Sequence, residues 1–163
     1  MIYERLEQLM MPDVREFMIE ADNVANVIDR HSLSNALLIL SQVNYALIPV
    51  LTTKSQFVGL LSMPMIIKSV MTVEAIELQR LDEMRVEEVM LQNPVRVTLD
   101  VSLSELLHVL IDHSFVCVVD DQDRFLGIVT RKKLLQRLTH LLHETSNPKE
   151  LQRLIQLLSE DEA

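Results

Sequence analysis

Two stretches of this chain share one pattern: Phe57-Val58-Gly59-Leu60-Leu61-Ser62 and Phe125-Leu126-Gly127-Ile128-Val129-Thr130. Each stretch reads as an aromatic residue, an apolar residue, a glycine, two apolar residues and a hydroxyl residue. The chain has 163 residues but only 2 glycines, and both lie at the same place in this pattern. Self-similarity at a long period is the signature of a repeated supersecondary unit. The pattern therefore predicts a fold made from two similar units.

Further matches lie upstream of both glycines and keep the same order. The matching segments are 14–18 with 86–90, 32–37 with 102–107, and 45–50 with 115–120. The offset between the copies falls from 72 residues at the first pair to 68 at the glycines, as short loop deletions would produce. Four landmarks in one order indicate an internal duplication.

Each copy predicts the element order helix, strand, helix, strand, strand, helix. The first helix ends at Met18 or Met90. Ser32 and Ser102 fit the N-cap of the second helix, because a serine hydroxyl can accept a hydrogen bond from an amide of the first turn. Glu105 follows Ser102 by three residues, which is the capping-box arrangement. The other expected elements are strands at 24–28, 95–99, 46–51 and 115–119, a strand through each glycine, and closing helices at 65–71 and 133–143.

These elements divide the chain into five parts. The parts are an N-terminal helix at 1–13, a first unit at 14–71, a helical linker at 72–85, a second unit at 86–143 and a C-terminal helix at 148–160. A unit of about 60 residues buries too little surface to be stable alone, so the two units are expected to share one core. The apolar residues Val73, Ile76 and Leu81 predict that the linker packs. The apolar stripe of the C-terminal helix either packs within the protein's own dimer or against the N-terminal helix, or it docks another protein.

Composition narrows the classes of function. Asp and Glu number 24 against 15 Lys and Arg, and the net charge of -9 argues against a nucleic-acid binder or a polybasic membrane anchor. The sequence shows no signal peptide and no apolar run long enough to span a membrane, so a cytoplasmic location is expected. The single Cys117 excludes a disulfide within the chain and a multi-cysteine zinc site, and it is expected to be a small buried apolar residue. No catalytic or metal-binding set of residues is found, so we expect a protein that is not an enzyme.

The duplicated pattern resembles a tandem pair of CBS domains, which is a regulatory module. The resemblance covers about residues 14–143 and is carried by Phe17-Met18, Val89-Met90, Ile48-Pro49-Val50 and the two glycine-containing stretches. It implies an α+β (α/β-like) fold of two βαββα units related by a pseudo-twofold axis, with helices added at both ends. It also implies a homodimer and a cleft between the units that binds an adenosine-containing ligand.

One position departs from most nucleotide-binding members of this family. Those members follow the late strand with Ser or Thr, two residues and an Asp, whose carboxylate accepts both ribose hydroxyls. Here Ser62 leads to Met65 and Thr130 leads to Lys133, so both copies lack the carboxylate. The second copy carries a cluster of cations, Arg124, Arg131, Lys132, Lys133 and Arg137. These side chains either bind phosphate at a helix N-terminus or are solvated charges on a helix start.

A ligand that contains adenines and phosphates but no free ribose diol is cyclic di-AMP, because its 3′ oxygen is part of a phosphodiester. The chain is similar to the stand-alone cyclic-di-AMP-binding CBS proteins of Gram-positive bacteria, the DarB/CbpB family. The strings that carry this similarity are Phe17-Met18-Ile19-Glu20-Ala21-Asp22, Tyr45-Ala46-Leu47-Ile48-Pro49-Val50, Val86-Glu87-Glu88-Val89-Met90-Leu91 and Phe115-Val116-Cys117-Val118. The resemblance implies a ligand site at Asn23, Ala25, Tyr45, Ala46, Leu47, Arg131 and Lys132.

Within that site the resemblance implies a role for each group. Ala25 and Leu47 hold adenine edges, and Arg131 and Lys132 bind phosphate. Tyr45 either flanks a base with its ring or is a core residue at a strand edge. The family often has Lys, Thr and Arg at three of these positions, which are occupied here by Asn23, Ala46 and Lys132. Each change removes a charge, a hydroxyl or a bidentate fork, and the changes predict either weaker binding or loss of binding.

The resulting hypothesis is a non-enzymatic cytoplasmic receptor that binds cyclic di-AMP, with no other cofactor or metal, and regulates a protein partner. Such regulation requires that the ligand favour one state of the receptor over another. The resemblance implies partners such as the (p)ppGpp synthetase/hydrolase or pyruvate carboxylase. One alternative is a sensor of AMP, ADP or ATP, which the missing carboxylate disfavours. The other alternative is a dimerisation or scaffold module without a ligand.

Overall fold

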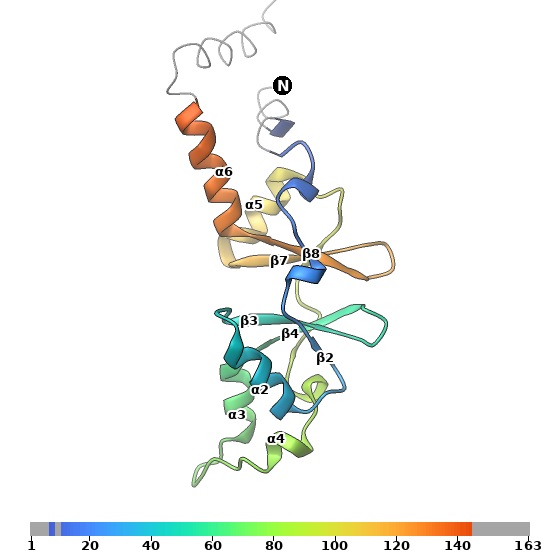
Figure 1. Cartoon of the computed structure of the whole chain (residues 1–163), viewed down its shortest axis with the longest axis vertical. Helices are drawn as coiled ribbons and strands as arrows, with labels where there is room; N and C mark the ends of the chain where they lie inside the picture. Colours follow the sequence, from blue (N-terminus) through green and yellow to red (C-terminus); the bar gives the residue numbers. More distant parts are fainter. Residues whose placement is uncertain (1–6, 9–10, 145–163) are drawn as a thin grey trace, which may run out of the picture. The chain divides into compact units, whose positions relative to one another are not determined.

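The computed structural model describes residues 7–8 and 11–144 (Figure 1). The C-terminal helix predicted at 148–160 lies outside the described residues, as does most of the N-terminal helix predicted at 1–13. The described residues form two four-stranded sheets with α-helices packed beside them. The predicted α+β fold class is confirmed.

The first sheet has the strand order β2-β3-β4-β5. Strands β2 (Val27–Ile28) and β3 (Leu47–Leu51) are parallel, so the chain must cross over between them. Helix α2 (Leu33–Gln42) makes this crossover. Strand β4 (Phe57–Ser62) returns antiparallel to β3, and β5 (Leu91–Gln92) pairs antiparallel with β4. Helices α2 and α3 (Met63–Val70) lie on one face of this sheet (Figure 1).

The second sheet repeats this arrangement in the order β1-β8-β7-β6. Strands β6 (Arg96–Val97) and β7 (Phe115–Val119) are parallel and are joined through α5 (Leu103–Asp112). Strand β8 (Phe125–Thr130) holds the second glycine-containing stretch, and the two-residue β1 (Ile19–Glu20) lies at the edge. Each sheet therefore has one edge strand that comes from the other copy of the repeat. Strand β5, at the edge of the first sheet, belongs to the second copy, and β1, at the edge of the second sheet, belongs to the first copy. The sequence analysis did not predict this exchange.

Serine and threonine hydroxyls set the helix starts. The Ser32 hydroxyl accepts from the Asn35 amide at 3.3 Å, and Ser102 forms the predicted capping box with Glu105, so both predicted N-caps are confirmed. Helices α3 (Met63–Val70) and α6 (Arg131–Glu144) each begin two residues before the predicted start. The reason is that Ser62 and Thr130, the last residues of the preceding strands, cap these helices directly.

The strands predicted at 24–28 and 95–99 are shorter in the structure, because only β2 and β6 pair there. Three single-turn 3-10 helices precede or follow the short edge strands, namely η1 (Val14–Glu16), η2 (Ala21–Asn23) and η3 (Val86–Glu88). Backbone groups of η1 and η3 are satisfied within one turn, so the helices predicted to end at Met18 and Met90 stop at Glu16 and Glu88.

Residues 72–85, predicted as a helical linker, are helical only at α4 (Arg80–Glu83). Thr72 closes a turn instead, since its hydroxyl and amide both hydrogen-bond the Ala75 carbonyl, at 3.0 and 2.8 Å. The prediction that the linker packs is right for Leu81, which is buried, and wrong for Val73 and Ile76, which are exposed.

The described residues fall into two compact units, which differ from the sequence repeats. Unit 1 contains those of Met1–Met18, Leu99–Val116 and Ile128–Ala163, and unit 2 contains Ile19–Thr98 and Cys117–Gly127. Unit 2 has an apolar core made by residues from strands β2, β3 and β4 and from α2, α3, α4 and η3: Val27, Leu33, Ala36, Leu40, Ile48, Val50, Leu61, Ile66, Val70, Leu81 and Val86. In unit 1 the buried residues of α5 and α6 are Leu103, Leu106, Leu110 and Leu134.

Two hairpin loops of unit 2 are joined to each other. The Phe57 amide donates to the Asp123 carbonyl and the Phe125 amide to the Ser55 carbonyl, both at 2.9 Å. Ser55 and Asp123 have φ angles of 62° and 59°, so equivalent turn residues of the two copies take the same left-handed conformation. The two copies are thus linked through matching positions of their hairpins.

Candidate functional site

Five of the predicted ligand-binding residues lie in unit 2, in the two segments that lead into β2 and β3. Asn23 ends η2, Ala25 follows it, and Leu47 is the first residue of β3. Val27 pairs with Val50 in parallel register, so the residues that precede the two strands lie at the same end of the sheet. The structure therefore brings the segments 23–25 and 45–47 to one sheet end.

The exposure of these residues separates the two interpretations of Tyr45. The side chain of Tyr45 is 53% exposed, and Ala46 and Asn23 are exposed as well. Tyr45 is therefore not a core residue of the sheet, and its ring has a face free to meet a planar group.

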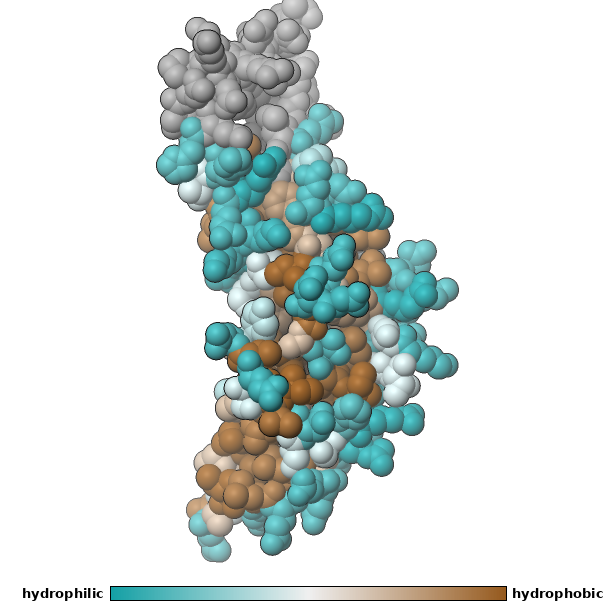
Figure 2. Space-filling model, viewed as in Figure 1, coloured by the Kyte–Doolittle hydropathy of each residue, from teal (hydrophilic) through white to brown (hydrophobic). Residues whose placement is uncertain are grey.

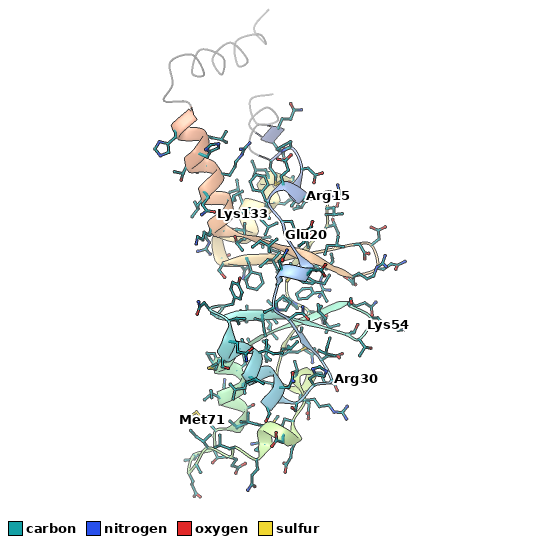
Figure 3. All side chains as sticks on the ribbon, viewed as in Figure 1. Arg15, Glu20, Arg30, Lys54, Met71 and Lys133 are labelled. Carbon is teal, nitrogen blue, oxygen red and sulfur yellow. The ribbon has the colours of Figure 1, made fainter. Side chains whose placement is uncertain are left out.

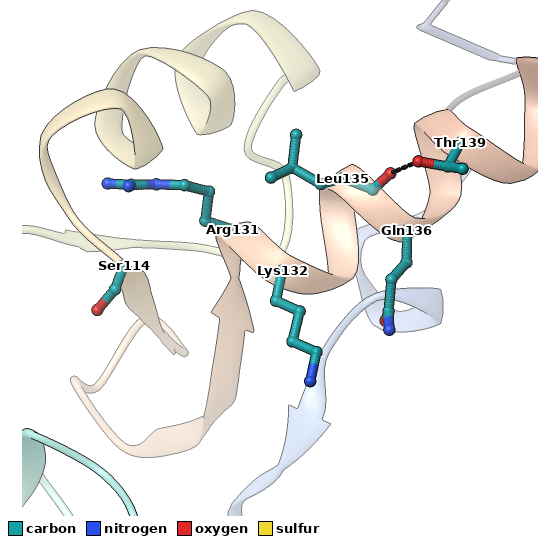
Figure 4. Close-up of a pocket in the computed structure, with 6 residues that line it drawn as sticks. All are labelled: Ser114, Arg131, Lys132, Leu135, Gln136 and Thr139. Carbon is teal, nitrogen blue, oxygen red and sulfur yellow. Dashed lines mark hydrogen bonds between the residues drawn. The ribbon is translucent and has the colours of Figure 1, made fainter.

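The other two predicted residues, Arg131 and Lys132, lie in unit 1 at the first two positions of α6. They line an open groove with a volume of about 560 Å³, together with Ser114, Leu135, Gln136 and Thr139 (Figure 4). This volume lies within the range of small-molecule sites in proteins. The positive end of the α6 dipole and two cations make this groove suited to an anion.

Arg131 already makes contacts within unit 1. Its Nε donates to the Leu110 carbonyl at 2.7 Å, and its Nη2 donates to the Ile111 carbonyl at 3.1 Å. Its backbone amide donates to the Ser114 carbonyl at 2.8 Å. These three acceptors lie in the last turn of α5 and just beyond it. Lys132 is exposed, and its side chain extends in a different direction from that of Arg131 (Figure 4).

The positions where related nucleotide-binding units carry Asp are occupied by Met65 and Lys133. The Met65 amide donates to the Ser62 hydroxyl at 3.4 Å, and the Lys133 amide donates to the Thr130 hydroxyl at 3.1 Å. Both residues therefore stand at the third position of a helix that follows a strand. The predicted correspondence between the copies holds here, and neither position offers a carboxylate for a ribose diol.

Four groove residues were missed by the sequence analysis, namely Ser114, Leu135, Gln136 and Thr139. A signal for three of them was present, because residues four apart share a face of a helix. Leu135 and Thr139 follow Arg131 at this spacing, and Gln136 follows Lys132. Ser114 had no such signal, since it reaches the groove through the packing of α5 against the start of α6.

Cys117 is buried, as predicted, and burial raises the pKa of its thiol to about 12. The thiol therefore stays protonated near neutral pH and is a poor nucleophile. Within residues 7–8 and 11–144, no three His, Cys, Asp or Glu side chains are grouped so that they could hold a metal ion. The same part of the chain contains no helix long and apolar enough to cross a membrane.

Comparison with known proteins shows what the chain is similar to. The family profile of the CBS domain matches residues 86–140. Cyclic di-AMP receptor B from Bacillus subtilis is 39% identical over 138 residues, which cover 85% of this chain and 94% of that protein.

Two solved structures share the fold. The CbpB protein of Listeria monocytogenes in complex with c-di-AMP superposes with a TM-score of 0.75 at 36% identity, covering 80% of this chain and 97% of that chain. A hypothetical conserved protein from Geobacillus kaustophilus superposes with a TM-score of 0.76 at 42% identity, covering 79% of this chain and 97% of that chain.

Proposed function

The chain belongs to the CBS-domain family, as a tandem pair, and from this we propose that it is a receptor for cyclic di-AMP. The observation that carries the proposal is the groove at the start of α6, where two cations stand beside Lys133 in place of the ribose-binding Asp. The names of its relatives support the same ligand, because one is called a cyclic di-AMP receptor and another was solved with c-di-AMP.

Cyclic di-AMP fits this chemistry better than AMP or ATP does. Its two phosphodiesters need cationic partners, and Arg131 and Lys132 supply them at a helix N-terminus. Its 3′ oxygens are esterified, so the missing carboxylates at Met65 and Lys133 cost it nothing. A mononucleotide with a free diol would lose two hydrogen bonds at the same positions.

We assign the unit 2 residues to the adenines. Tyr45 presents an exposed ring to one face of a base, while Ala25 and Leu47 supply apolar contact and backbone groups. Asn23 and Ala46 stand beside these residues without the charge and the hydroxyl that the family often has there, so we expect binding of moderate strength.

Calorimetric titration of nucleotide-stripped protein tests this proposal. We expect saturable binding of cyclic di-AMP, with AMP, ATP and cyclic di-GMP as parallel controls that bind more weakly or not at all. Heat from AMP or ATP without heat from cyclic di-AMP would make the protein an adenine-nucleotide sensor. If none of the four ligands gives binding heat, the result would favour a scaffold module without a ligand.

We further propose that the protein acts without catalysis in the cytoplasm, and that cyclic di-AMP changes its affinity for a protein partner. Such a change requires unequal ligand affinity for the partner-binding and partner-free states. Affinity capture with immobilised protein, with and without cyclic di-AMP, should recover partners in a ligand-dependent manner. Recovery of the same proteins under both conditions would contradict regulation by the ligand.

Exposed apolar side chains support the homodimer that the family resemblance implies. Met63 and Ile67 are 36% and 37% exposed and lie on one face of α3, and Met71, 53% exposed, caps the end of this helix. Leu135 of α6 occupies the position equivalent to Ile67. Figure 2 shows apolar surface gathered where Figure 1 places α2 and α3, and Figure 3 labels Met71 beyond the end of α3. We expect light scattering to report a dimer, and Ile67→Glu to shift it toward monomer.

A further inference from the structure

The turn that joins α3 to α4 carries apolar side chains on its outer surface. Val73 is fully exposed, and Ile76 and Leu78 are 56% and 66% exposed, although Val70 before the turn and Leu81 after it are buried. Single apolar residues are common on protein surfaces, but several close together mark a site of interaction. Figure 1 shows this turn projecting at one end of unit 2, beyond α3 and α4.

Hydrogen bonds hold this turn in one conformation. The Thr72 amide and hydroxyl donate to the Ala75 carbonyl, and the Ala75 amide donates back to the Thr72 hydroxyl at 3.1 Å. The Glu77 amide donates to the Val70 carbonyl at 2.9 Å, which closes the base of the turn. A surface that is already ordered loses less conformational entropy on binding. The apolar side chains are therefore presented in a form that is ready to bind.

Carboxylates surround these apolar side chains. The segment 71–83 contains four of them, Glu74, Glu77, Asp82 and Glu83, against one cation, Arg80. The Arg80 guanidinium is already paired with Glu77, at 3.7 Å between Nη1 and Oε2, and Glu74 and Glu83 are exposed. Charges that meet across an interface are complementary, so a surface that fits this turn carries lysine or arginine around an apolar pocket.

We propose that the turn at residues 72–78 is a docking surface for a different protein, which receives Val73, Ile76 and Leu78 in an apolar pocket with a basic rim. This inference rests on the proposed function for the existence of a protein partner, and it adds where that partner binds and what chemistry its surface has.

A second copy of this chain fits the turn less well. A twofold pairing of two turns would place Glu74 and Glu77 of one copy against the same carboxylates of the other. The net charge of -9 adds to this repulsion. The exposed side chains Met63 and Ile67, which we assign to the homodimer, lie on α3 and not in the turn.

Photo-crosslinking in the cells that naturally contain this protein identifies what contacts the turn. Val73 is replaced by benzoylphenylalanine, and the matched control carries the same group at Lys54, an exposed residue of the β3–β4 hairpin (Figure 3). We expect an adduct with another protein from position 73 and about tenfold less of it from position 54. The crosslinked peptide of that protein should contain lysine or arginine beside apolar residues.

Two outcomes of this experiment would overturn the proposal. An adduct with twice the mass of the chain would assign the turn to a second copy. Equal yields from positions 73 and 54, or no adduct from either, would show that the turn is not a docking surface.

Titration of the purified crosslinked protein tests which side chains contribute. We expect Val73→Ser to weaken its binding about tenfold, because a buried valine is lost from the interface. Glu74→Gln should flatten the salt dependence of the dissociation constant, because it removes a charge that faces the basic rim. Val95→Ser is the matched control, since Val95 is also exposed in unit 2. Wild-type affinity in Val73→Ser would contradict the proposal.

The docking surface and the receptor can fail independently. Val73→Ser should bind cyclic di-AMP with wild-type affinity, because Val73 is not among the residues assigned to that ligand. If wild-type protein does not bind cyclic di-AMP, an adduct from position 73 still supports the docking surface, without control by that ligand. If it binds cyclic di-AMP but position 73 gives no adduct, the receptor proposal stands and the docking surface is overturned.

Discussion

The guanidinium of Arg96 lies over the ring of Phe57, 4.8 Å from its centre, and also hydrogen-bonds the carbonyl of the same residue at 2.8 Å. The same Nη1 atom lies 3.2 Å from a carboxylate oxygen of Asp123, so one side chain contacts both hairpins of unit 2. The first copy has Asn26 near the equivalent place, which makes this cation a feature of one copy only.

Replacing Arg96 should loosen this junction. Arg96→Met keeps the apolar stem and removes the guanidinium, so the Phe57 carbonyl and ring both lose a charged partner. We expect the free energy of unfolding in urea to fall by about 2 kcal/mol. Arg30→Met is the matched control, because Arg30 is exposed at the surface of unit 2 (Figure 3). Equal destabilisation by the two variants would show that the contact contributes nothing.

Gly59 should not tolerate a side chain. A Cβ atom there would lie 2.8 Å from the Leu91 carbonyl oxygen and 2.5 Å from the Met90 sulfur, so β4 and β5 would have to separate. We expect Gly59→Ala to lower the free energy of unfolding by about 1–3 kcal/mol, measured by urea denaturation. In the background of Met90→Ala, Gly59→Ala should still lower the free energy of unfolding, though by less, since the clash with the Leu91 backbone oxygen remains. Full recovery would place the whole clash on the methionine.

The Cys117 thiol should react only in unfolded protein. Burial raises its pKa to about 12, so at pH 8 about one molecule in ten thousand carries the thiolate. We expect almost no reaction with a chromogenic disulfide at pH 8 until denaturant is added. Fast reaction of the native protein would contradict the burial.

The same pKa predicts how stability depends on alkaline pH. The native thiol holds its proton more tightly than the unfolded thiol, whose pKa is about 8.5. Its contribution is therefore complete below pH 8.5 and is lost as the pH rises from there toward 12. Unfolding curves of wild type and Cys117→Ala, compared between pH 8 and 10, should converge as the pH rises. A constant difference would refute this prediction.

Tyr45 should matter for the ligand and not for the fold. Its side chain is 53% exposed, so Tyr45→Ala should change the free energy of unfolding by less than about 0.5 kcal/mol. If the ring flanks an adenine, the same change should weaken cyclic di-AMP binding about tenfold, as loss of a base stack does. Tyr45→Phe keeps the ring and should bind normally. A large loss in Tyr45→Phe would assign the contact to the hydroxyl.

Much of the fold could be predicted because its main features occur twice in the sequence. Hydroxyl residues before helices, such as Ser32 and Ser102, repeat at a fixed offset, and the longer strands are continuous apolar runs. The two-residue strands β1 and β5 carry no such signal, since two residues cannot show a period. The turn at Thr72 was also missed, because the apolar spacing around it suggests a helix while its own hydroxyl and amide both bond to Ala75.

The candidate site was predictable only in part. Residue identity and resemblance pointed to Arg131 and Lys132, and the structure places both in one groove. The divergence of the two side chains could not be predicted, because the side-chain acceptors of Arg131 are carbonyls on α5, 21 and 20 residues earlier in the chain. Every residue carries a backbone carbonyl, so residue types do not show which carbonyl will accept a hydrogen bond from a side chain.

The exchanged edge strands have a consequence for any attempt to divide this chain. Each copy contributes two residues to the other's sheet, so neither copy contains a complete sheet of its own. A chain cut between the copies would leave each sheet with an unpaired edge, and an unpaired edge is a template for pairing with another chain. The separated halves are therefore expected to associate through these edges rather than to behave as two independent domains.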